Sequence, residues 1–436
     1  MSTPVETERE VLRDRTLLRR EGLAGLTTFL AMAYILFVNP QILGDAGVPE
    51  DAVFVATALA AAVGSIVMGV WARLPIALAP GMGLNAFFAY TVVLGMGVPW
   101  ETALAGTLVS GVLFLILALT GVREAVINAI PLNAKLAVGA GIGLFIAFIG
   151  AKNAGIIVAD EANYVGMGDL SAAGPLVAVL GVIVTSVLLV LGLRAAVFAG
   201  LAITAVVAVV VGVAPVPDAI VGSVPSLAPT FGVAFGSLGE LLTPSLAVVV
   251  FTMLFVDLFD TSGTLMAVTN QAGLLTEDGK IPRAGRALGS DSVATIAGSI
   301  VGTSTTTSYI ESSAGIGTGG KTGITAVTTG LLFLLALPFS PLLATITAEV
   351  TAPALIVVGV MMARSLGQIE WGRYEEAIPA FAIVLVIPLA FSIAKGIAVG
   401  LFLVPLMMLA AGRWREVSPI LWVLAVLFVI YFGWLA

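Results

Sequence analysis

The chain has 436 residues, of which 59% are hydrophobic and only 10% are charged, and its mean hydropathy is +1.12. Soluble domains carry about 25% charged residues, so this composition excludes a water-soluble fold. The net charge of −7 comes without a basic stripe, which argues against nucleic acid as a partner. The sequence contains neither Cys nor His, so thiolate chemistry is excluded and any proton-carrying step falls to Asp or Glu.

The first twenty residues are polar and precede the first apolar run. They lack the apolar core and the cleavage site of a signal peptide. By the positive-inside rule, their arginines predict a cytoplasmic N-terminal tail over residues 1–21 in a multi-pass protein of the cell membrane. These arginines are Arg9, Arg13, Arg15, Arg19 and Arg20.

Apolar runs of bilayer-spanning length, which is about 20 residues, then follow one another along the chain. The first seven spans are predicted near 22–43, 52–71, 82–96, 102–121, 131–150, 173–191 and 196–213. After a loop rich in Pro, Gly and Ser, further spans are predicted near 245–270, 288–301, 308–318, 322–340, 345–363, 376–393, 395–411 and 417–434. The last run is one more than two equal halves require. We therefore predict an all-α membrane fold of about 14 spans in two inverted repeats of seven.

The third span of each half is short, polar and interrupted by glycine. Residues 75–88 include Gly81, Gly83 and Asn85, and residues 302–315 include a run of hydroxyl side chains followed by Glu311. Paired breaks at matching places are the best sequence indication of a transporter's binding site, because non-helical backbone survives in a membrane only where protein or water covers it. We expect extended backbone in spans 3 and 10, and a half-helix that starts near Ser308 and directs its positive end at a cavity.

Polar residues also share one face of the span at 245–270. Asp257, Asp260, Thr261 and Thr264 stand at i, i+3, i+4 and i+7. Carboxylates in a membrane helix are costly unless they face the interior and are protonated or paired, so Asp257, Asp260 and Glu311 are candidates for carrying a proton. Two structural alternatives stay open: a helix-packing network for the aspartates, and a helix cap for Glu311.

Three further residues have a suggested role. The amide of Asn85 offers a donor and an acceptor, which suits the edge of a heterocyclic base. Phe87 could offer a stacking face, although aromatic residues in membrane helices are usually packing residues. Asp291 precedes an apolar run and is interpreted as a helix cap.

Segments 81–90, 255–263 and 302–315 resemble, in order, the AzgA-like purine permeases of the nucleobase–cation symporter-2 superfamily. The resemblance extends from about Leu26 to Tyr431 and implies a uracil-permease-like fold. It also implies a core domain (22–122 and 243–341) and a gate domain (123–242 and 342–436). The substrate-binding set that we expect consists of Asn85, Asp257, Glu311, Gly83, Phe87, Thr261 and Ser312, with Asp257, Asp260 and Glu311 in proton coupling. No cofactor, metal or catalytic residue is expected.

The resemblance implies import of hypoxanthine, guanine or adenine with a proton, while the core domain moves against the gate domain. The preferred purine, sodium coupling and a homodimer stay open. Alternatives are a transporter of the same fold for uracil, xanthine or an inorganic anion, a membrane-embedded hydrolase, and a channel. The acidic residues argue against an anion. A hydrolase is disfavoured because Asp257 and Asp260 lie on one helix without a Ser/Lys or metal-ligand set, and a channel because carboxylates beside broken helices suit occlusion.

Overall fold

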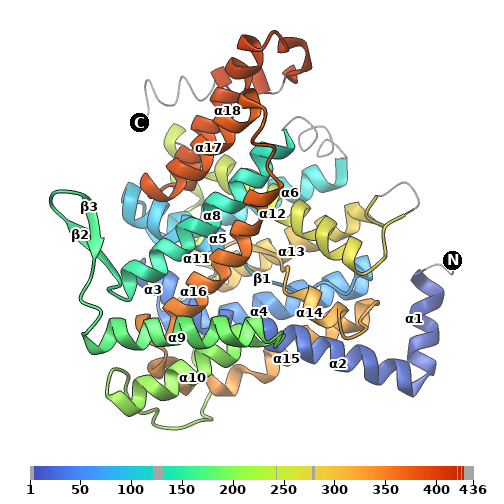
Figure 1. The fold of residues 1–436 in the computed structure, drawn as a ribbon. Coiled ribbons are helices and arrows are strands. Elements are labelled where there is room, and N and C mark those ends of the chain that lie inside the picture. The colour runs from blue at the N-terminus through green and yellow to red at the C-terminus, as the bar shows by residue number, and fades with distance from the viewer. Residues whose placement is uncertain are drawn as a thin grey trace.

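The computed structural model describes residues 4–120, 131–241, 243–276, 280–419, 421–423 and 425–426. Most of these residues form helices that pack around a common centre (Figure 1). Within the described part, eight helices are long and apolar enough to cross a membrane, or nine if the bent pair α15–η4 forms one span. The chain is therefore a multi-pass membrane protein.

The first half of the chain contains one series of elements. It comprises α1 (Pro4–Arg13), α2 (Arg15–Met32), α3 (Ile35–Asp45), α4 (Glu50–Val67), η1 (Met68–Ala72), β1 (Leu78–Pro80), α5 (Met82–Ala86), η2 (Phe87–Gly95), α6 (Trp100–Thr120), α8 (Leu132–Asn153), β2 (Ile157–Asp160), β3 (Tyr164–Met167), α9 (Ala173–Val190) and α10 (Ala196–Val211).

The second half contains the matching series. It comprises α11 (Val233–Gly236), η3 (Leu238–Leu241), α12 (Pro244–Gln271), α13 (Ala284–Val301), β4 (Thr306–Ser308), α14 (Ser312–Ile316), α15 (Gly323–Leu335), η4 (Leu337–Thr345), α16 (Ala348–Ala363), η5 (Arg364–Gln368), α17 (Tyr374–Leu389), α18 (Ile393–Ala410) and η6 (Trp414–Glu416).

The packing of these elements repeats between the halves. Helix α4 packs against α13, and α8 packs against α16. Helix α6 lies on α13 as α15 lies on α4, and α17 lies on α8 as α9 lies on α16. These helix contacts of one half thus have counterparts when the two series are exchanged, as expected of a fold built from two repeats. The predicted fold class and the extended breaks in spans 3 and 10 are confirmed, and the number of spans stays a prediction.

Element boundaries follow local chemistry. Helix α12 begins after Thr243, whose hydroxyl accepts a hydrogen bond from the backbone N–H of Leu246 at 3.4 Å. Helix α13 ends at Gly302, whose φ of +105° is a conformation that other residues rarely adopt. This turn redirects the chain into the extended segment that contains β4.

Several boundaries differ from the prediction. Helix α2 starts at Arg15 rather than near residue 22, because the Asp14 carboxylate caps it by accepting from the backbone N–H of Thr16 at 2.7 Å. The half-helix expected near Ser308 begins at Ser312 and has five residues, so it is too short for a helix-dipole argument. Most of the run predicted at 417–434 lies outside the described residues.

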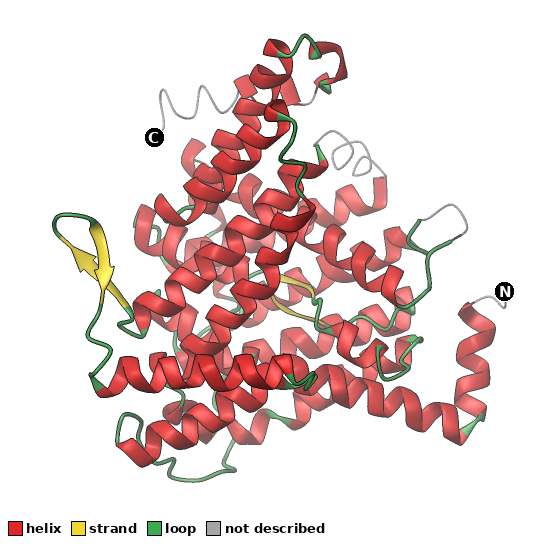
Figure 2. Cartoon of the chain, in the orientation of Figure 1, coloured by secondary structure: helices red, strands yellow, loops and turns green. Residues whose placement is uncertain are grey.

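The sequence analysis also missed the hairpin of β2 and β3, which projects from the helical body (Figure 2). The carboxylate of Asp160 closes its turn by accepting from the backbone N–H groups of Ala162 at 3.0 Å and Asn163 at 2.6 Å. Tyr164 follows with a φ of 67°.

Candidate substrate site

The two interrupted segments meet at the centre of the molecule as a pair of strands (Figure 2). Strand β1 pairs with β4 in antiparallel orientation, with Leu78 opposite Ser308 and Pro80 opposite Thr306. The pairing continues past the strands, because the backbone N–H of Tyr309 donates to the carbonyl of Ala77 at 3.0 Å. Extended backbone from both halves of the chain thus lies side by side inside the helical bundle.

Hydroxyl side chains hydrogen-bond to the strand backbone groups. In the first half, the Ser65 hydroxyl of α4 accepts from the N–H of Leu78 at 2.9 Å and donates to its carbonyl at 3.1 Å. In the second half, the Thr295 hydroxyl of α13 accepts from the N–H of Thr306 at 3.2 Å and donates to its carbonyl at 2.9 Å. The same device in matching helices explains how non-helical backbone is tolerated at this depth.

Asn85 lies on α5, directly after the first strand, and is completely buried. Its Oδ1 accepts a hydrogen bond from the hydroxyl of Ser304, so the second broken segment fixes the orientation of the amide. Its Nδ2 has no hydrogen-bond partner among the described residues. An amide donor without a partner is costly in a buried site, and a ligand acceptor would remove that cost.

A polar cluster connects α12 to α13 and β4. The Thr261 hydroxyl lies 2.9 Å from Oδ2 of Asp291, 2.8 Å from the Thr307 hydroxyl and 3.3 Å from Oδ1 of Asp257. The Ser308 hydroxyl donates to Oδ1 of Asp291 at 3.1 Å. Asp257, Thr261 and Asp291 are all completely buried. Two carboxylates and a row of hydroxyls therefore meet beside the strand pair.

The interpretation of Asp291 as a helix cap is wrong. Helix α13 begins at Ala284, and Asp291 stands seven residues inside it. Ser290 and Ser292, its neighbours in sequence, suggest a cap, but both donate to carbonyls one turn back in the same helix. The contacts of Asp291 with the hydroxyl-rich segment would have indicated its role, but these contacts are known only from the tertiary structure.

Glu311 stands at the N-cap position of α14, but its side chain makes no capping hydrogen bond. Its Oε1 instead accepts from the Tyr34 hydroxyl, at the start of α3, at 2.8 Å. Asp260 lies on α12, which contacts α14. The three carboxylates expected to carry a proton thus lie on two elements, α12 and the start of α14, and Tyr34 is a neighbour that the sequence analysis did not identify.

The remaining predicted residues have different surroundings. Gly83 permits close packing of α5 on α8, since a Cβ there would lie 2.5 Å from Cγ2 of Ile142. Ser312 accepts from the backbone N–H of Ala77 at 3.0 Å, so it joins the two broken segments. Phe87 is buried and lines a cavity.

That cavity has a volume of about 350 Å³ and lies between η2, α12, the end of α8 and the α17–α18 turn. Thr91, Lys152 and Phe391 contribute to its wall. The rings of Tyr90 and Phe391 meet edge to face with their centroids 6.2 Å apart. The cavity therefore borders η2, which directly follows the helix that carries Asn85. In the described part of the chain no cluster of acidic side chains is arranged to hold a metal ion.

Comparison with known proteins decides the family. A sequence model described as a permease family, Xan_ur_permease, matches residues 19–399. The chain belongs to this permease family. It is 53% identical to the guanine/hypoxanthine permease PbuG of Bacillus subtilis, over 95% of this chain and 96% of that protein. It is 44% identical to the adenine permease AdeQ of Escherichia coli, over 95% and 92% of the two chains.

These similarities agree with the resemblance to AzgA-like purine permeases, and they identify the chain as a transporter rather than an enzyme. The hydrolase alternative is therefore removed. Among solved structures, the transmembrane domain of the cyanobacterial bicarbonate transporter BicA is similar with a TM-score of 0.65 at 13% identity, over 87% of this chain and 98% of that one. SLC26A9 is similar with a TM-score of 0.62 at 11% identity, over 90% and 66%. At such identities the likeness concerns the fold alone.

Proposed function

We propose that this permease carries purine nucleobases, and that the base binds between α5, α12 and the start of α14. The observation that supports this most directly is the unpartnered Nδ2 donor of buried Asn85 in the same central region as the carboxylates of Asp257 and Glu311. A purine presents ring N–H groups and unprotonated ring nitrogens on different edges. The amide would donate to a ring acceptor, and the carboxylates would accept from ring N–H groups.

The relatives add support for the substrate class, because those named above are guanine/hypoxanthine and adenine permeases. A site of matched donors and acceptors rejects an analogue that lacks the matching group much more strongly than an apolar pocket does. We therefore expect purines to be preferred over uracil.

We further propose proton symport. Asp257 and Asp260 lie on α12 and Glu311 lies at the start of α14, the elements proposed to hold the base, and the sequence has no His. A charged carboxylate at membrane depth is costly, and protonation removes that cost, so loading and release of one proton can accompany loading and release of the base.

Alternating access would come from movement of one group of helices against the other. All the proposed binding residues lie in α2–α6 and α12–α15, whereas α8–α10 and α16–α18 pack mainly on one another. A site that belongs to one group is best exposed on each side by moving that group as a body. We also propose that the N-terminus is cytoplasmic, as its arginines predict.

Calorimetry on the purified protein tests the site. The substitutions Glu311→Gln and Asp257→Asn should each weaken hypoxanthine binding by about tenfold or more, because a hydrogen bond to a charged group contributes about 1.5–3 kcal/mol. Asp51→Asn, which changes an exposed carboxylate in the first turn of α4, serves as the matched control and should bind normally. Unchanged affinity in both site variants would remove these residues from the site.

Uptake into liposomes tests the substrate and the coupling. A panel of radiolabelled hypoxanthine, guanine, adenine, xanthine and uracil is applied with and without an imposed proton gradient. We expect purine uptake that collapses with a protonophore and is unaffected when choline replaces sodium. Faster uptake of uracil than of every purine would contradict the proposed substrate class, and sodium dependence at constant pH would contradict proton coupling.

A further inference from the structure

A groove lined by arginines lies between α2, the turn that joins α9 to α10, and the turn that follows α14. It contains Arg19 and Arg20 from α2, Arg194 from the α9–α10 turn, and the backbone at Gly317, and it has a volume of about 660 Å³. Helices α2, α9, α10 and α15 lie together along the lower edge of the view in Figure 1. The groove is separate from the 350 Å³ cavity, since the two share no lining residue.

Two of the three arginines lie against the turn after α14. Gly319 has a φ of +106°, and a Cβ there would lie 2.9 Å from Cδ of Arg20, so the glycine leaves room for the arginine stem. Nη2 of Arg194 donates to the carbonyl of Gly317 at 3.0 Å. A guanidinium has five N–H donors, so most of the donors of each arginine stay available to a ligand.

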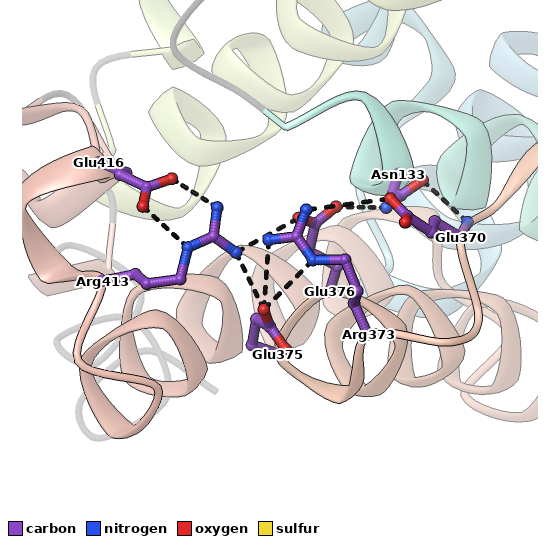
Figure 3. A network of polar contacts seen from close by, with 7 residues as sticks. All are labelled: Asn133, Glu370, Arg373, Glu375, Glu376, Arg413 and Glu416. Carbon is purple, nitrogen blue, oxygen red and sulfur yellow. Dashed lines mark hydrogen bonds and ion pairs between the residues drawn. The ribbon is translucent and has the colours of Figure 1, made fainter.

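The groove has no carboxylate in its lining, and in the described part of the chain none of its arginines forms an ion pair. Two arginines on another part of the structure do form ion pairs. At the ends of α17 and α18, Arg373 and Arg413 lie within a network of four glutamates and Asn133 (Figure 3). Three uncompensated guanidinium groups on one surface indicate a site for an external anion.

The chemistry of the wall specifies the anion. Arginine forks match the geometry of phosphate oxygens, and the hydroxyls of Thr16 and Thr318 in the same lining add further donors. Leu23 also lines the groove and is 51% exposed, so an apolar surface continues directly from the basic one. Basic pockets between membrane helices suit lipid headgroups for this reason.

We propose that this groove binds a phosphate-bearing anion, with the headgroup of an anionic phospholipid as its source and its acyl chain on the Leu23 side. The anion would bridge α2 and the α14–α15 turn to the α9–α10 turn. These segments belong to the two groups of helices that we propose to move against each other. Its binding would therefore tie the two groups together on the face that carries the N-terminus, independently of which substrate the permease carries.

The test uses the delipidated full chain in detergent. Short-chain phosphatidylglycerol, phosphatidylcholine and inorganic phosphate are titrated separately, and binding is followed by native mass spectrometry and by thermal stabilisation. We expect saturable phosphatidylglycerol binding that becomes at least about tenfold weaker in the variant Arg19→Gln/Arg20→Gln/Arg194→Gln. Arg19→Gln alone should give a smaller loss, and since Arg19 makes no hydrogen bond or ion pair in the described chain, this variant should fold normally. The variant Arg13→Gln/Arg15→Gln removes two nearby exposed arginines outside the groove and is the control.

The two anions separate the possible sources. Saturable phosphatidylglycerol binding that is tighter than that of phosphatidylcholine and of inorganic phosphate supports the lipid headgroup as the source. Inorganic phosphate that binds as tightly as phosphatidylglycerol, or phosphatidylcholine that does so, overturns an anionic lipid as the source. The proposal is overturned if neither anion binds saturably, if the triple variant binds within twofold of the unmodified protein, or if the control variant loses as much affinity.

Discussion

Replacing Thr261 by Val should destabilise the protein, because it removes contacts in the buried polar cluster between α12, α13 and β4. The substitution keeps the volume of the side chain and removes a completely buried hydroxyl that contacts Asp291, Thr307 and Asp257. Asp291 keeps the hydrogen bond from Ser308, whereas its contact with residue 261 is lost. The Thr307 hydroxyl also loses its contact with residue 261. A buried polar group that loses its hydrogen bond costs about 1–3 kcal/mol, so we predict a loss of about 1–3 kcal/mol in the free energy of unfolding.

The matched control is Thr261→Ser, which keeps the hydroxyl and removes one methyl group. It should cost about 0.5–1.5 kcal/mol, the usual range for losing one buried methyl. Unfolding in mixed micelles is followed by tryptophan fluorescence, with purine binding measured on the folded protein. If the Val variant unfolds at the same denaturant concentration as the Ser variant, the hydroxyl does not hold the cluster together and the reasoning is refuted.

Three further predictions follow from other contacts. Tyr34→Phe removes the phenol that donates to the carboxylate at the start of α14 at 2.8 Å, and calorimetry should show purine binding weakened by about tenfold, with unchanged binding as the contrary result. The chain has no native cysteine, so the pair Asp45→Cys/Asn153→Cys can be oxidised without side reactions at other cysteines. The native side chains lie 3.3 Å apart on α3 and α8, so a disulfide here would join the two groups of helices and should stop liposome uptake. Undiminished uptake after complete oxidation would contradict domain movement. Arg413 hydrogen-bonds to Glu416 and lowers the pKa of that carboxyl below 4.5, so the pair contributes stability above about pH 4.5 that is lost as the pH falls further. Glu416→Gln should make the melting temperature depend less on pH between about pH 3 and 6. An unchanged dependence on pH would count against the pair.

The sequence could predict where the membrane helices break because the cause is local. Gly81 and Gly83 in one half, and the hydroxyl run that ends at Ser308 in the other, interrupt apolar runs with residues that favour non-helical backbone. The same local chemistry could not predict which strand pairs with which. Leu78 and Ser308 lie opposite each other although they are far apart in sequence, and that register depends on packing of the whole bundle.

For the candidate residues, local periodicity predicts which of them share a helix face, but not which side chains meet them from other elements. The spacing of Asp257 and Thr261 on one helix face follows from helical periodicity, and the structure has them within hydrogen-bonding distance at 3.3 Å. Tyr34 was not identified and Asp291 was interpreted as a helix cap, because each contacts the candidate residues from another element. In the sequence, the phenol of Tyr34 is explained by helix packing and the carboxylate of Asp291 by a helix cap. Only their neighbours in the folded chain indicate a functional role.

The two repeats contribute unlike residues to the proposed site. Their scaffolding is equivalent, since Ser65 and Thr295 clamp matching strands in the same way. The first repeat then supplies the amide of Asn85, whereas the second supplies the carboxylates of Asp257 and Glu311. A symmetric pair of half-sites would suit a ligand with two equal edges. A purine has donors on some edges and acceptors on others, so the proposed site requires the two repeats to differ at these positions. Their side chains do differ there, although both halves share the position of the break.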